Sequence, residues 1–427
     1  MGSSHRMQGN YLGKRLHTHG QVTNAFLYDE AKPFHTLILG MTGSGKSTLM
    51  LNLMLEDLRQ GNGFALIDPH GDLSDTLLTQ IPQNRLSDVI LFDPSDLERP
   101  IGLNILWDVP EAAQARTTAG LVAAFKSIWS DSWGPRLEYI LSNSLAALIE
   151  TGDATLLHLI RFLRDDRFRT RILKRVKDPL ILGFFQDEFN RYPDRLKQEA
   201  IAPVLNKVGQ LLLHKPMRNV LGQMRSLVSF SEVMQRNQVF IAKLSKGELG
   251  SGPAQLLGSF LSTQFELAAL ERSKLPANQR KLFCLYVDEV QNLTGESLAH
   301  ILAEGRKYGL ALTLATQTLE TLDLTLKTAL LANVGTIIAF KVSSQDADVL
   351  EKAYAGNTKS HQFVDVPRFE AWVRPKSLTG RDYPYRLKTE EPTLQAAANP
   401  DRVKQHSRMI FGRTREEIEA KIERWLK

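Results

Sequence analysis

The sequence has 427 residues but only one cysteine, Cys284, and no apolar run close to the roughly 18 residues that a membrane-spanning helix needs. A single cysteine excludes an internal disulfide and is typical of a protein in a reducing cytosol. Because Cys284 lies within an apolar run, we interpret it as a small buried hydrophobic residue. A secretory signal, internal repeats and low-complexity tracts are also missing. These absences favour a cytoplasmic globular protein with no membrane span in this chain.

The composition supports the same class of protein. Hydrophobic residues make up 43% and charged residues 23% of the chain, as in ordinary globular proteins. A length of 427 residues is sufficient for two or three domains with a substantial core. The net charge of +6 permits a polyanionic partner but does not require one. Residues 1–7 are interpreted as the remnant of an expression tag and are left out of the fold argument.

The strongest local pattern is the phosphate-binding motif G-x-x-x-x-G-K-[ST] at residues 40–47. An apolar run, Leu37–Leu39, precedes it, and a helical pattern over Lys46–Gln60 follows. Glycines without a Cβ let successive N–H groups point at a polyphosphate, and the helix start adds positive potential. We therefore predict a nucleoside triphosphate site in which Lys46 reaches the β- and γ-phosphates and Ser47 coordinates Mg²⁺. The residues expected to bind the nucleotide are Gly40, Thr42, Gly43, Ser44, Gly45, Lys46, Ser47 and Thr48.

A second pattern supplies the acidic groups that hydrolysis requires. The apolar strand pattern beginning at Leu282 ends in two carboxylates, Asp288 and Glu289. Asp288 would hold Mg²⁺ opposite Ser47, and Glu289 would orient and deprotonate the attacking water. Gln317 also ends a strand pattern. It is either a polar sensor beside the γ-phosphate or a strand end that meets solvent.

Further strand patterns alternate with helical ones, which predicts a central parallel sheet in an α/β fold. Asp68 ends the first of these strands and has two open interpretations. It either orders water or a metal ion, or begins a turn with Pro69 and Gly71. The strand patterns are Phe64–Ile67, Val89–Phe92, Val239–Ala242, Leu310–Ala315 and Gly335–Val342, and the helical patterns include Pro253–Ser273 and Ser297–Tyr308.

A long stretch between these patterns is helical and almost free of strand-like runs, which predicts an all-α domain inserted into the core. Within it, basic residues are dense from Arg161 to Lys177. They fit either a solvated helix face or a DNA-facing surface. The predicted domains are an N-terminal arm at 8–32, the core at 33–108 and 236–400, the all-α insert at 109–235 and a tail helix at 401–427.

The two ends of the chain carry weaker signals. In the N-terminal arm only Val22–Tyr28 is strand-like, which is too little for a separate domain. The tail helix has a predicted start, because Thr414 and Glu417 form a capping box. Its apolar stripe consists of Ile418, Ile422, Trp425 and Leu426.

In combination these stretches resemble the HerA–FtsK division of P-loop ATPases, and within it the conjugative coupling ATPases of the TraG/TraD type. The resemblance covers nearly the whole chain from about residue 33 to 373. Two stretches, Trp133–Tyr139 and Leu244–Gly250, resemble the coupling branch more than HerA. The other stretches that carry it are His35–Thr48, Ile67–Leu73, Tyr286–Asn292, Glu304–Gly309 and Leu314–Gln317.

The resemblance implies a RecA-like motor that assembles as a homo-hexamer, with ATP and Mg²⁺ at the subunit interfaces and DNA through the centre. It assigns phosphate and Mg²⁺ binding to Lys46 and Ser47, hydrolysis to Asp288 and Glu289, and the sensor role to Gln317. Arg306 matches an arginine that acts on the γ-phosphate, usually that of the neighbouring subunit. Such a second positive charge would stabilise the transition state. The alternative for Arg306 is a plain arginine on a helix surface.

We therefore expect an ATP-driven DNA translocase that serves the transfer or processing of mobile DNA, an ATPase located in the cytoplasm or peripheral to a membrane secretion complex. Relaxosome or type IV secretion proteins are the expected protein partners. One alternative is a type IV secretion ATPase that handles protein cargo, and another is a nucleotide-gated adaptor that docks such proteins. Coupling ATPases commonly carry N-terminal membrane helices, which this sequence lacks. The chain is therefore either a naturally soluble member or a shortened one.

Overall fold

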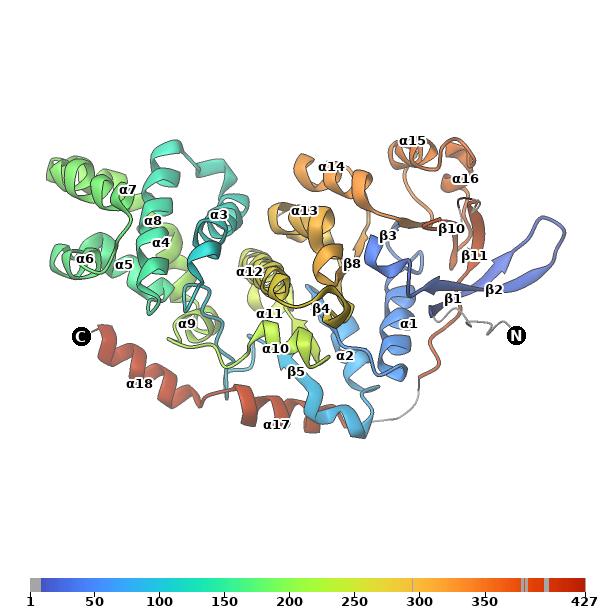
Figure 1. Ribbon diagram of the computed structural model, residues 1–427, viewed down its shortest axis with the longest axis horizontal. Helices are drawn as coiled ribbons and strands as arrows, with labels where there is room; N and C mark the ends of the chain where they lie inside the picture. The colour runs from blue at the N-terminus through green and yellow to red at the C-terminus, as the bar shows by residue number, and fades with distance from the viewer. Residues whose placement is uncertain (1–8, 294, 378–379, 381–382, 395–398, 427) are drawn as a thin grey trace. The chain divides into compact units, whose positions relative to one another are not determined.

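The computed structural model describes residues 9–293, 295–377, 380, 383–394 and 399–426. The chain divides into two compact units, each of which is described by itself. We call the first the sheet unit; it contains Met1–Leu91, Phe230–Lys243 and Ala268–Lys404. The second, the helical unit, contains Phe92–Ser229, Leu244–Leu267 and Gln405–Lys427. Figure 1 shows the elements of both.

The strands form one large sheet with a parallel centre and an antiparallel extension, and the order among the described residues is β2-β1-β11-β10-β9-β3-β8-β7-β4-β6-β5. In the centre, β3 pairs in parallel with β8 and β9, and β7 pairs in parallel with β4 and β8. This central parallel sheet confirms the predicted α/β class. The strands are β1 (Gly9–Leu16), β2 (Val22–Tyr28), β3 (Thr36–Leu39), β4 (Phe64–Asp68), β5 (Val89–Phe92), β6 (Val239–Lys243), β7 (Phe283–Val287), β8 (Leu310–Thr316), β9 (Thr336–Ala339), β10 (Glu370–Arg374) and β11 (Tyr385–Lys388).

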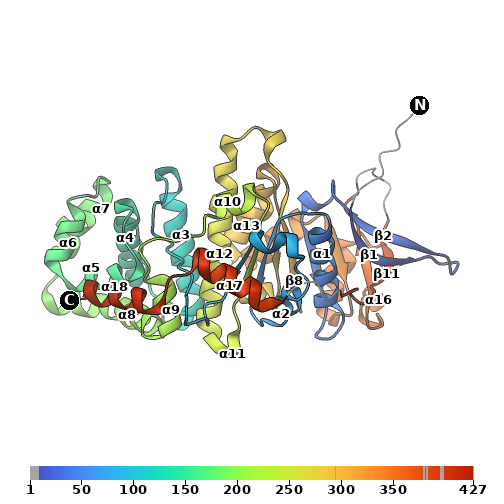
Figure 2. The same cartoon turned by 90° about the horizontal axis from the view of Figure 1, so that it is seen from below.

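Helices cover the parallel strands, and every residue of β3, β4, β7 and β8 is buried as a result. Helix α1 packs against β1 and β8, while α13 packs against α14 and β8 (Figures 1 and 2). The helices of the sheet unit are α1 (Lys46–Arg59), α2 (Asp72–Leu78), α10 (Phe230–Gln235), α13 (Gly295–Glu304), α14 (Leu324–Asn333), α15 (Ser344–Ala353) and α16 (Ser360–Val364). Helices α12 (Ser251–Glu271) and α17 (Pro400–Phe411) contain residues of both units.

The N-terminal arm is part of the sheet, and the prediction that Val22–Tyr28 is its only strand was wrong. Residues Gly9–Leu16 form β1, which pairs with both β2 and β11. The apolar alternation is weak because β1 contains two glycines and two cations and its register shifts between Tyr11 and Gly13. Pairing with β11, which follows about 370 residues later, stabilises this segment, and local sequence does not encode that contact.

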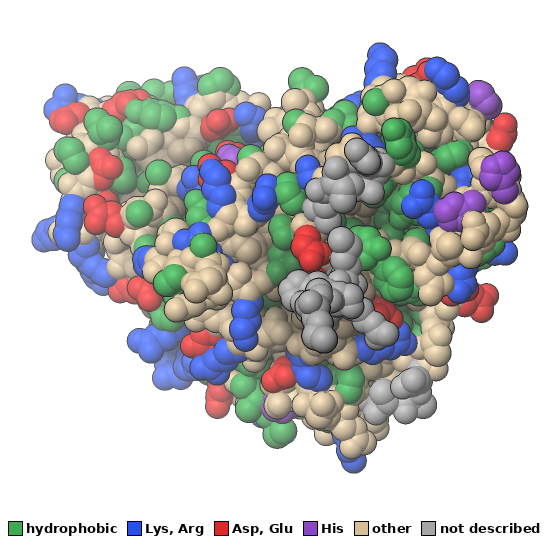
Figure 3. Space-filling model, turned by 45° about the vertical axis from the view of Figure 1, so that its right-hand side comes forward, with side chains coloured by type: hydrophobic (Ala, Val, Ile, Leu, Met, Phe, Trp, Pro, Cys, Tyr) green, Lys and Arg blue, Asp and Glu red, His purple; other side chains and the backbone are tan. Residues whose placement is uncertain are grey.

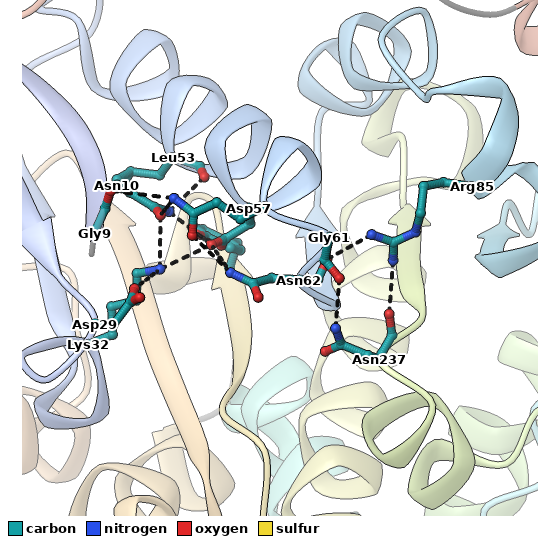
Figure 4. Close-up of polar contacts among 12 residues, drawn as sticks. Gly9, Asn10, Asp29, Lys32, Leu53, Asp57, Gly61, Asn62, Arg85 and Asn237 are labelled. Atoms are coloured by element: carbon teal, nitrogen blue, oxygen red, sulfur yellow. Dashed lines mark hydrogen bonds and ion pairs between the residues drawn. The ribbon is translucent and has the colours of Figure 1, made fainter. Parts of the chain in front are cut away.

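A buried polar cluster around Asp57 connects the N-terminal arm to α1 (Figure 4). The Lys32 ammonium contacts Asp57 Oδ1 at 3.2 Å and Asp29 Oδ1 at 2.8 Å, and only 4% of the Lys32 side chain is exposed. Asn10 donates to Asp57 Oδ1 at 2.9 Å, and the Tyr286 hydroxyl donates to Asp57 Oδ2 at 2.5 Å. Asp57 therefore joins the arm, α1 and β7. Removing one partner of such a cluster would leave an uncompensated buried charge.

Helices build the second unit. Helix α4 (Pro135–Thr151) buries an apolar face, with Leu137, Ile140 and Leu145 each at most 6% exposed. None of the helices in the described part of the chain has the length and apolar character required to cross a bilayer. The helices of this unit are α3 (Glu111–Ile128), α4 (Pro135–Thr151), α5 (Leu156–Arg164), α6 (Asp166–Leu173), α7 (Pro179–Gly183), α8 (Asp194–Leu213), α9 (Lys215–Leu221), α11 (Lys246–Leu249) and α18 (Arg415–Leu426).

The tail helix matches its predicted start and stripe as far as the structure describes them. The Glu417 N–H donates to the Thr414 hydroxyl at 3.4 Å, which is the first half of a capping box. Ile418 and Ile422 are buried. The prediction for the Leu426 side chain lies outside the described residues.

The basic stretch from Arg161 to Lys177 does not form one uniform surface. Arg169 is only 2% exposed, donates to the Phe162 carbonyl oxygen at 3.0 Å and pairs with Asp166. Arg175 pairs with Asp153 at 3.0 Å. On the face shown in Figure 3, lysine and arginine side chains are scattered with acidic ones between them. The net charge alone therefore does not locate a DNA contact.

One buried histidine makes the stability of the sheet unit depend on pH. His35 is 2% exposed, its Nδ1 accepts from the Leu312 N–H at 3.0 Å, and burial lowers its pKa from 6.5 to about 4. The folded state therefore binds this proton less readily than the unfolded chain. The contribution of the neutral His35 imidazole to the free energy of unfolding is fully present above pH 6.5. It is lost as the pH falls toward 4, and the loss amounts to up to about 3 kcal/mol.

We expect the free energy of unfolding in urea to fall between pH 7 and pH 4.5, and His35→Asn to remove part of this fall. Asparagine suits the comparison because it tolerates the positive φ of 63° at this position. The variant's absolute stability is not the readout, since only the pH dependence reports the imidazole. An equal pH dependence in the variant and the wild type would contradict the assignment.

Candidate nucleotide-binding site

The loop between β3 and α1 has the backbone that its glycines predict. Gly43 and Gly45 have φ values of 73° and 123°, which residues with side chains rarely adopt. A Cβ on Gly40 would lie 2.6 Å from the Phe340 Cβ. The Gly40 N–H donates to the Thr316 carbonyl at 3.2 Å and fixes the loop to β8. The loop therefore stands at the carboxyl ends of the central strands, where ligands of open α/β sheets bind.

The first turn of α1 places donors at this loop. Lys46 is 6% exposed, and its ammonium donates to the Met41 carbonyl oxygen at 3.2 Å. Burial lowers the pKa of Lys46, while the nearby Glu289 and Asp288 carboxylates act in the opposite direction. Ser47 is exposed, and the buried Ser44 hydroxyl has no hydrogen-bond partner in the described part of the chain. A buried unpaired hydroxyl in the same loop as a buried ammonium fits an anionic phosphate.

Asp288 and Glu289 directly follow β7, two strands away from β3, and are 6% and 8% exposed. The Asp288 N–H donates to the Ile67 carbonyl at 3.1 Å, which fixes the turn to β4. The pKa of Asp288 is raised to about 6, mainly by burial and then by the charges of the Asp68 and Glu289 carboxylates. Three carboxylates around one ammonium leave an excess of negative charge. A divalent cation would relieve that excess, so the donor set fits Mg²⁺.

Hydrogen bonds connect the acidic turn to the phosphate-binding loop through Gln317. The Gln317 amide donates to Glu289 Oε1 at 2.7 Å and accepts from the Thr42 hydroxyl at 3.1 Å. The structure thus brings together three residues predicted from separate stretches. Gln291, which the sequence did not single out, donates to Glu289 Oε2 and accepts from the Thr316 hydroxyl at 2.9 Å. Glu289 is therefore held from two sides, with a φ of 49°.

Asp68 has the turn-forming role of its two interpretations. It is fully buried, and its oxygens accept from the N–H groups of His70 at 3.0 Å, Gly71 at 2.9 Å and Ser74 at 2.8 Å. The Ser74 hydroxyl donates to it as well, at 2.8 Å. With these four bonds Asp68 closes the turn before α2 and stabilises the first turn of that helix, and its charge also acts on Asp288.

Arg306 does not lie with the other predicted residues of the same chain. It belongs to the turn Gly305–Tyr308 before β8, whereas Gln317 follows the end of that strand. Seven residues of extended strand span about 23 Å, so the two ends of β8 are far apart. The Arg306 side chain is exposed, and its guanidinium lies 3.8 Å from the ring centre of Phe34. Arg306 therefore cannot reach the loop of its own subunit.

Two residues that contact the loop, Arg368 and Phe369, were not predicted from the sequence. The Arg368 Nε donates to the Gly43 carbonyl at 3.0 Å, and the Phe369 N–H donates to the Ser44 carbonyl at 2.9 Å. Phe369 has a φ of 65°, and a Cβ on Gly45 would lie 3.1 Å from its ring. They come from the segment before β10 and belong to no motif. Arg368 adds an exposed cation beside the loop.

The sequence and the fold of this chain are similar to those of known proteins. A family model described as the type IV secretion-system coupling protein DNA-binding domain matches residues 22–359. The plasmid coupling protein TrwB in complex with ADP and Mg²⁺ has a similar structure, with a TM-score of 0.65, 18% identity, and coverage of 93% of this chain and 98% of that chain. The unbound TrwBdeltaN70 gives a TM-score of 0.63 and 16% identity, with coverage of 91% and 90%.

VirB4 of Thermoanaerobacter pseudethanolicus gives a TM-score of 0.57 and 15% identity, with coverage of 92% of this chain and 99% of that chain. No curated protein gives a significant match. At these identities the solved structures show the fold alone, which is the RecA-like P-loop ATPase fold predicted from the sequence.

Proposed function

Because the chain belongs to the family of type IV secretion-system coupling proteins, we propose that it is an ATP-driven DNA translocase that serves the transfer or processing of mobile DNA. The observation that carries this proposal is the bonded series Thr42–Gln317–Glu289. It connects the phosphate-binding loop with the acidic turn in one continuous site. An ATPase needs this connection, because the base that activates water must be set relative to the γ-phosphate.

In the proposed site the loop N–H groups, Lys46 and Ser44 hold the phosphates, with Thr48 next to them in the first turn of α1. Ser47 and Asp288 would hold Mg²⁺, which would screen the phosphate charge and orient the β- and γ-oxygens. TrwB, whose fold is similar, has been solved with ADP and Mg²⁺, which supports this pair of ligands. The raised pKa of Asp288 fits the role, since a cation would favour its charged form.

Hydrolysis is assigned to Glu289 and Gln317. Glu289 accepts the proton of the attacking water, and the bond from Gln291 keeps its carboxylate oriented. The Gln317 amide lies between Thr42 and Glu289. A γ-phosphate that enters the loop competes for the Thr42 hydroxyl, so Gln317 is placed to respond to its presence or loss.

Replacing Glu289 with glutamine should leave ATP binding intact and slow hydrolysis by on the order of 10²–10⁴-fold. The amide keeps the shape of the side chain and one oxygen that can accept a bond from Gln317 or Gln291, but it cannot accept the proton of water. ATP affinity and hydrolysis rate should be measured on the same preparation. Glu320→Gln, which changes an exposed carboxylate of the same unit, is the matched control and should hydrolyse normally. A variant that loses ATP binding instead would show that Glu289 has a structural role.

We assign Arg306 to the site of a neighbouring subunit. The length of β8 keeps it away from its own loop, its side chain is exposed, and the family resemblance supplies the expectation of a shared site. The assembly proposed is a homo-hexamer with ATP at the interfaces. Particle mass measured with and without nucleotide tests it, and a monomer at every concentration would oppose it.

DNA is the proposed substrate because the matched family is described by its DNA-binding domain. We propose that the helical insert at 109–235 contacts DNA or relaxosome and secretion proteins. The first alternative, a secretion ATPase for protein cargo, has the same fold, as the similarity to VirB4 illustrates. The second, a nucleotide-gated adaptor, would bind ATP without DNA-dependent turnover.

A further inference from the structure

Phe34 lies under two cations at the amino ends of the central strands. The Arg306 guanidinium is 3.8 Å and the Lys376 ammonium 4.2 Å from the centre of the Phe34 ring. The ring face attracts each cation, but two like charges so close to one ring repel each other. Among the described residues neither cation forms a salt bridge with a carboxylate. The cluster is therefore a positively charged surface to which no carboxylate of the described residues is paired.

The backbone of Phe34 cannot move easily, so the ring is a fixed platform. The Phe34 carbonyl accepts from the Gly335 N–H at 2.6 Å, and its own N–H donates to the Ala31 carbonyl at 3.0 Å. A Cβ at Gly335 would lie only 2.6 Å from the Phe34 Cβ, so the two segments meet at a distance that only glycine allows. Because the ring is fixed, it restricts the Arg306 side chain before a ligand binds, so Arg306 loses less conformational entropy on binding.

The residues on either side of Pro33 and Phe34 are anchored in the interior. Lys32 contacts Asp57 of α1 and Asp29, as Figure 4 shows. On the other side, His35 is buried and bonded to the Leu312 N–H. Pro33 and Phe34 are thus the half-buried residues of an otherwise buried segment. The position of its ring follows from the same elements, α1 and β8, that carry Lys46 and Gln317.

We propose that Phe34 is a positioning residue, which holds the Arg306 guanidinium, with Lys376 beside it, for the γ-phosphate bound in the neighbouring copy of this chain. The inference rests on the proposed function, because it needs a site shared between subunits. The ligand that satisfies the paired cations is the polyphosphate of the neighbour's ATP. Its charge complements the cluster, and stacking on the ring orients the planar fork of Arg306 for two parallel hydrogen bonds.

The test replaces Phe34 with leucine, which removes the ring and keeps an apolar side chain. We expect kcat to fall about tenfold, with unchanged KM, ATP affinity and particle mass, because the ring acts only on the transition-state contact. Phe34→Tyr keeps a ring face and should restore kcat to within about twofold of the wild type. Phe26→Leu, an exposed phenylalanine of β2, is the matched control and should not change kcat. If Phe34→Leu fails to fold, Phe34→Met takes its place with the same expectation.

A double-mutant cycle separates positioning from packing. In the Arg306→Ala background, Phe34→Leu should cause no further loss of kcat, since the residue that it positions is already gone. A second tenfold loss there would overturn the inference, because the ring would then act on something other than Arg306. A wild-type kcat for Phe34→Leu alone would overturn it as well.

Mixed rings show in which subunit the ring acts. Lys46→Ala subunits supply an intact Arg306, and Arg306→Ala subunits supply an intact phosphate loop. Adding Phe34→Leu to the Lys46→Ala subunit should lower the recovered rate about tenfold, whereas adding it to the Arg306→Ala subunit should leave that rate unchanged. Equal losses in both arrangements would contradict positioning.

The outcomes also separate this inference from the proposed function. If Arg306→Ala itself hydrolyses ATP like the wild type, the site shared between subunits, which the proposed function assigns to Arg306, fails. If Arg306→Ala is slow but Phe34→Leu is not, only the positioning role of Phe34 fails.

Discussion

Replacing Lys46 with alanine should lower ATP turnover by on the order of 10²–10³-fold or more while the protein stays folded. Among the described residues the Lys46 ammonium has one hydrogen bond, to the Met41 carbonyl within its own loop, so the core does not depend on it. Its loss would leave the phosphates in a weaker positive field. Steady-state hydrolysis by the purified variant, with circular dichroism as the check on folding, gives the answer.

Lys388→Ala is the matched control for Lys46→Ala. Lys388 is an exposed lysine on β11 of the same unit, and its loss should leave turnover unchanged. A folded Lys46→Ala protein that hydrolyses ATP at the wild-type rate would remove the basis for placing nucleotide in this loop.

Replacing Arg306 with alanine should be as damaging, but for a reason that lies between subunits. If Arg306 completes the neighbour's site, the wild-type rate per subunit rises steeply with protein concentration as rings form. The variant should stay slow at every concentration, by on the order of 10³–10⁵-fold. Lys307→Ala, which removes the adjacent exposed lysine, is the control and should keep the concentration dependence of the wild type.

Mixing the two inactive proteins, Lys46→Ala and Arg306→Ala, makes the test stricter. Some interfaces in mixed rings pair an intact Lys46 with an intact Arg306 from the next subunit. Those interfaces should recover measurable turnover, provided that a ring with some defective sites still works. A wild-type monomer that hydrolyses ATP at full rate at high dilution would instead return Arg306 to the role of a surface arginine.

The parts of the site that the sequence predicted are those that local chemistry determines. Glycine spacing, a strand before it and a helix after it determine the loop around Lys46, and the structure has the expected backbone there. An apolar strand that ends in acidic residues is similarly local, and Asp288 and Glu289 lie at the end of β7. Because parallel strands end at one edge of a sheet, Gln317 could be placed beside them.

The parts that the sequence missed depend on contacts between distant segments. Strand β1 exists because it pairs with β11, and the Arg368–Phe369 turn meets the loop only after the sheet has formed. The partners of Arg306 are also distant, since Phe34 precedes it by more than 270 residues. Residues Leu244–Leu267, predicted as core, cluster with the helical unit. No periodicity or motif in these segments reports such contacts.

The most direct measurement of the central claim is the ATP hydrolysis rate of the wild-type protein at concentrations that form rings, without DNA, with single-stranded DNA and with double-stranded DNA. Glu289→Gln serves as the background control. A DNA translocase should be stimulated by at least one form of DNA, and the stimulation should weaken as salt rises, because phosphate contacts release counterions. Identical rates in all three conditions, together with stimulation by a secretion or relaxosome protein, would contradict the claim and favour a protein-handling ATPase.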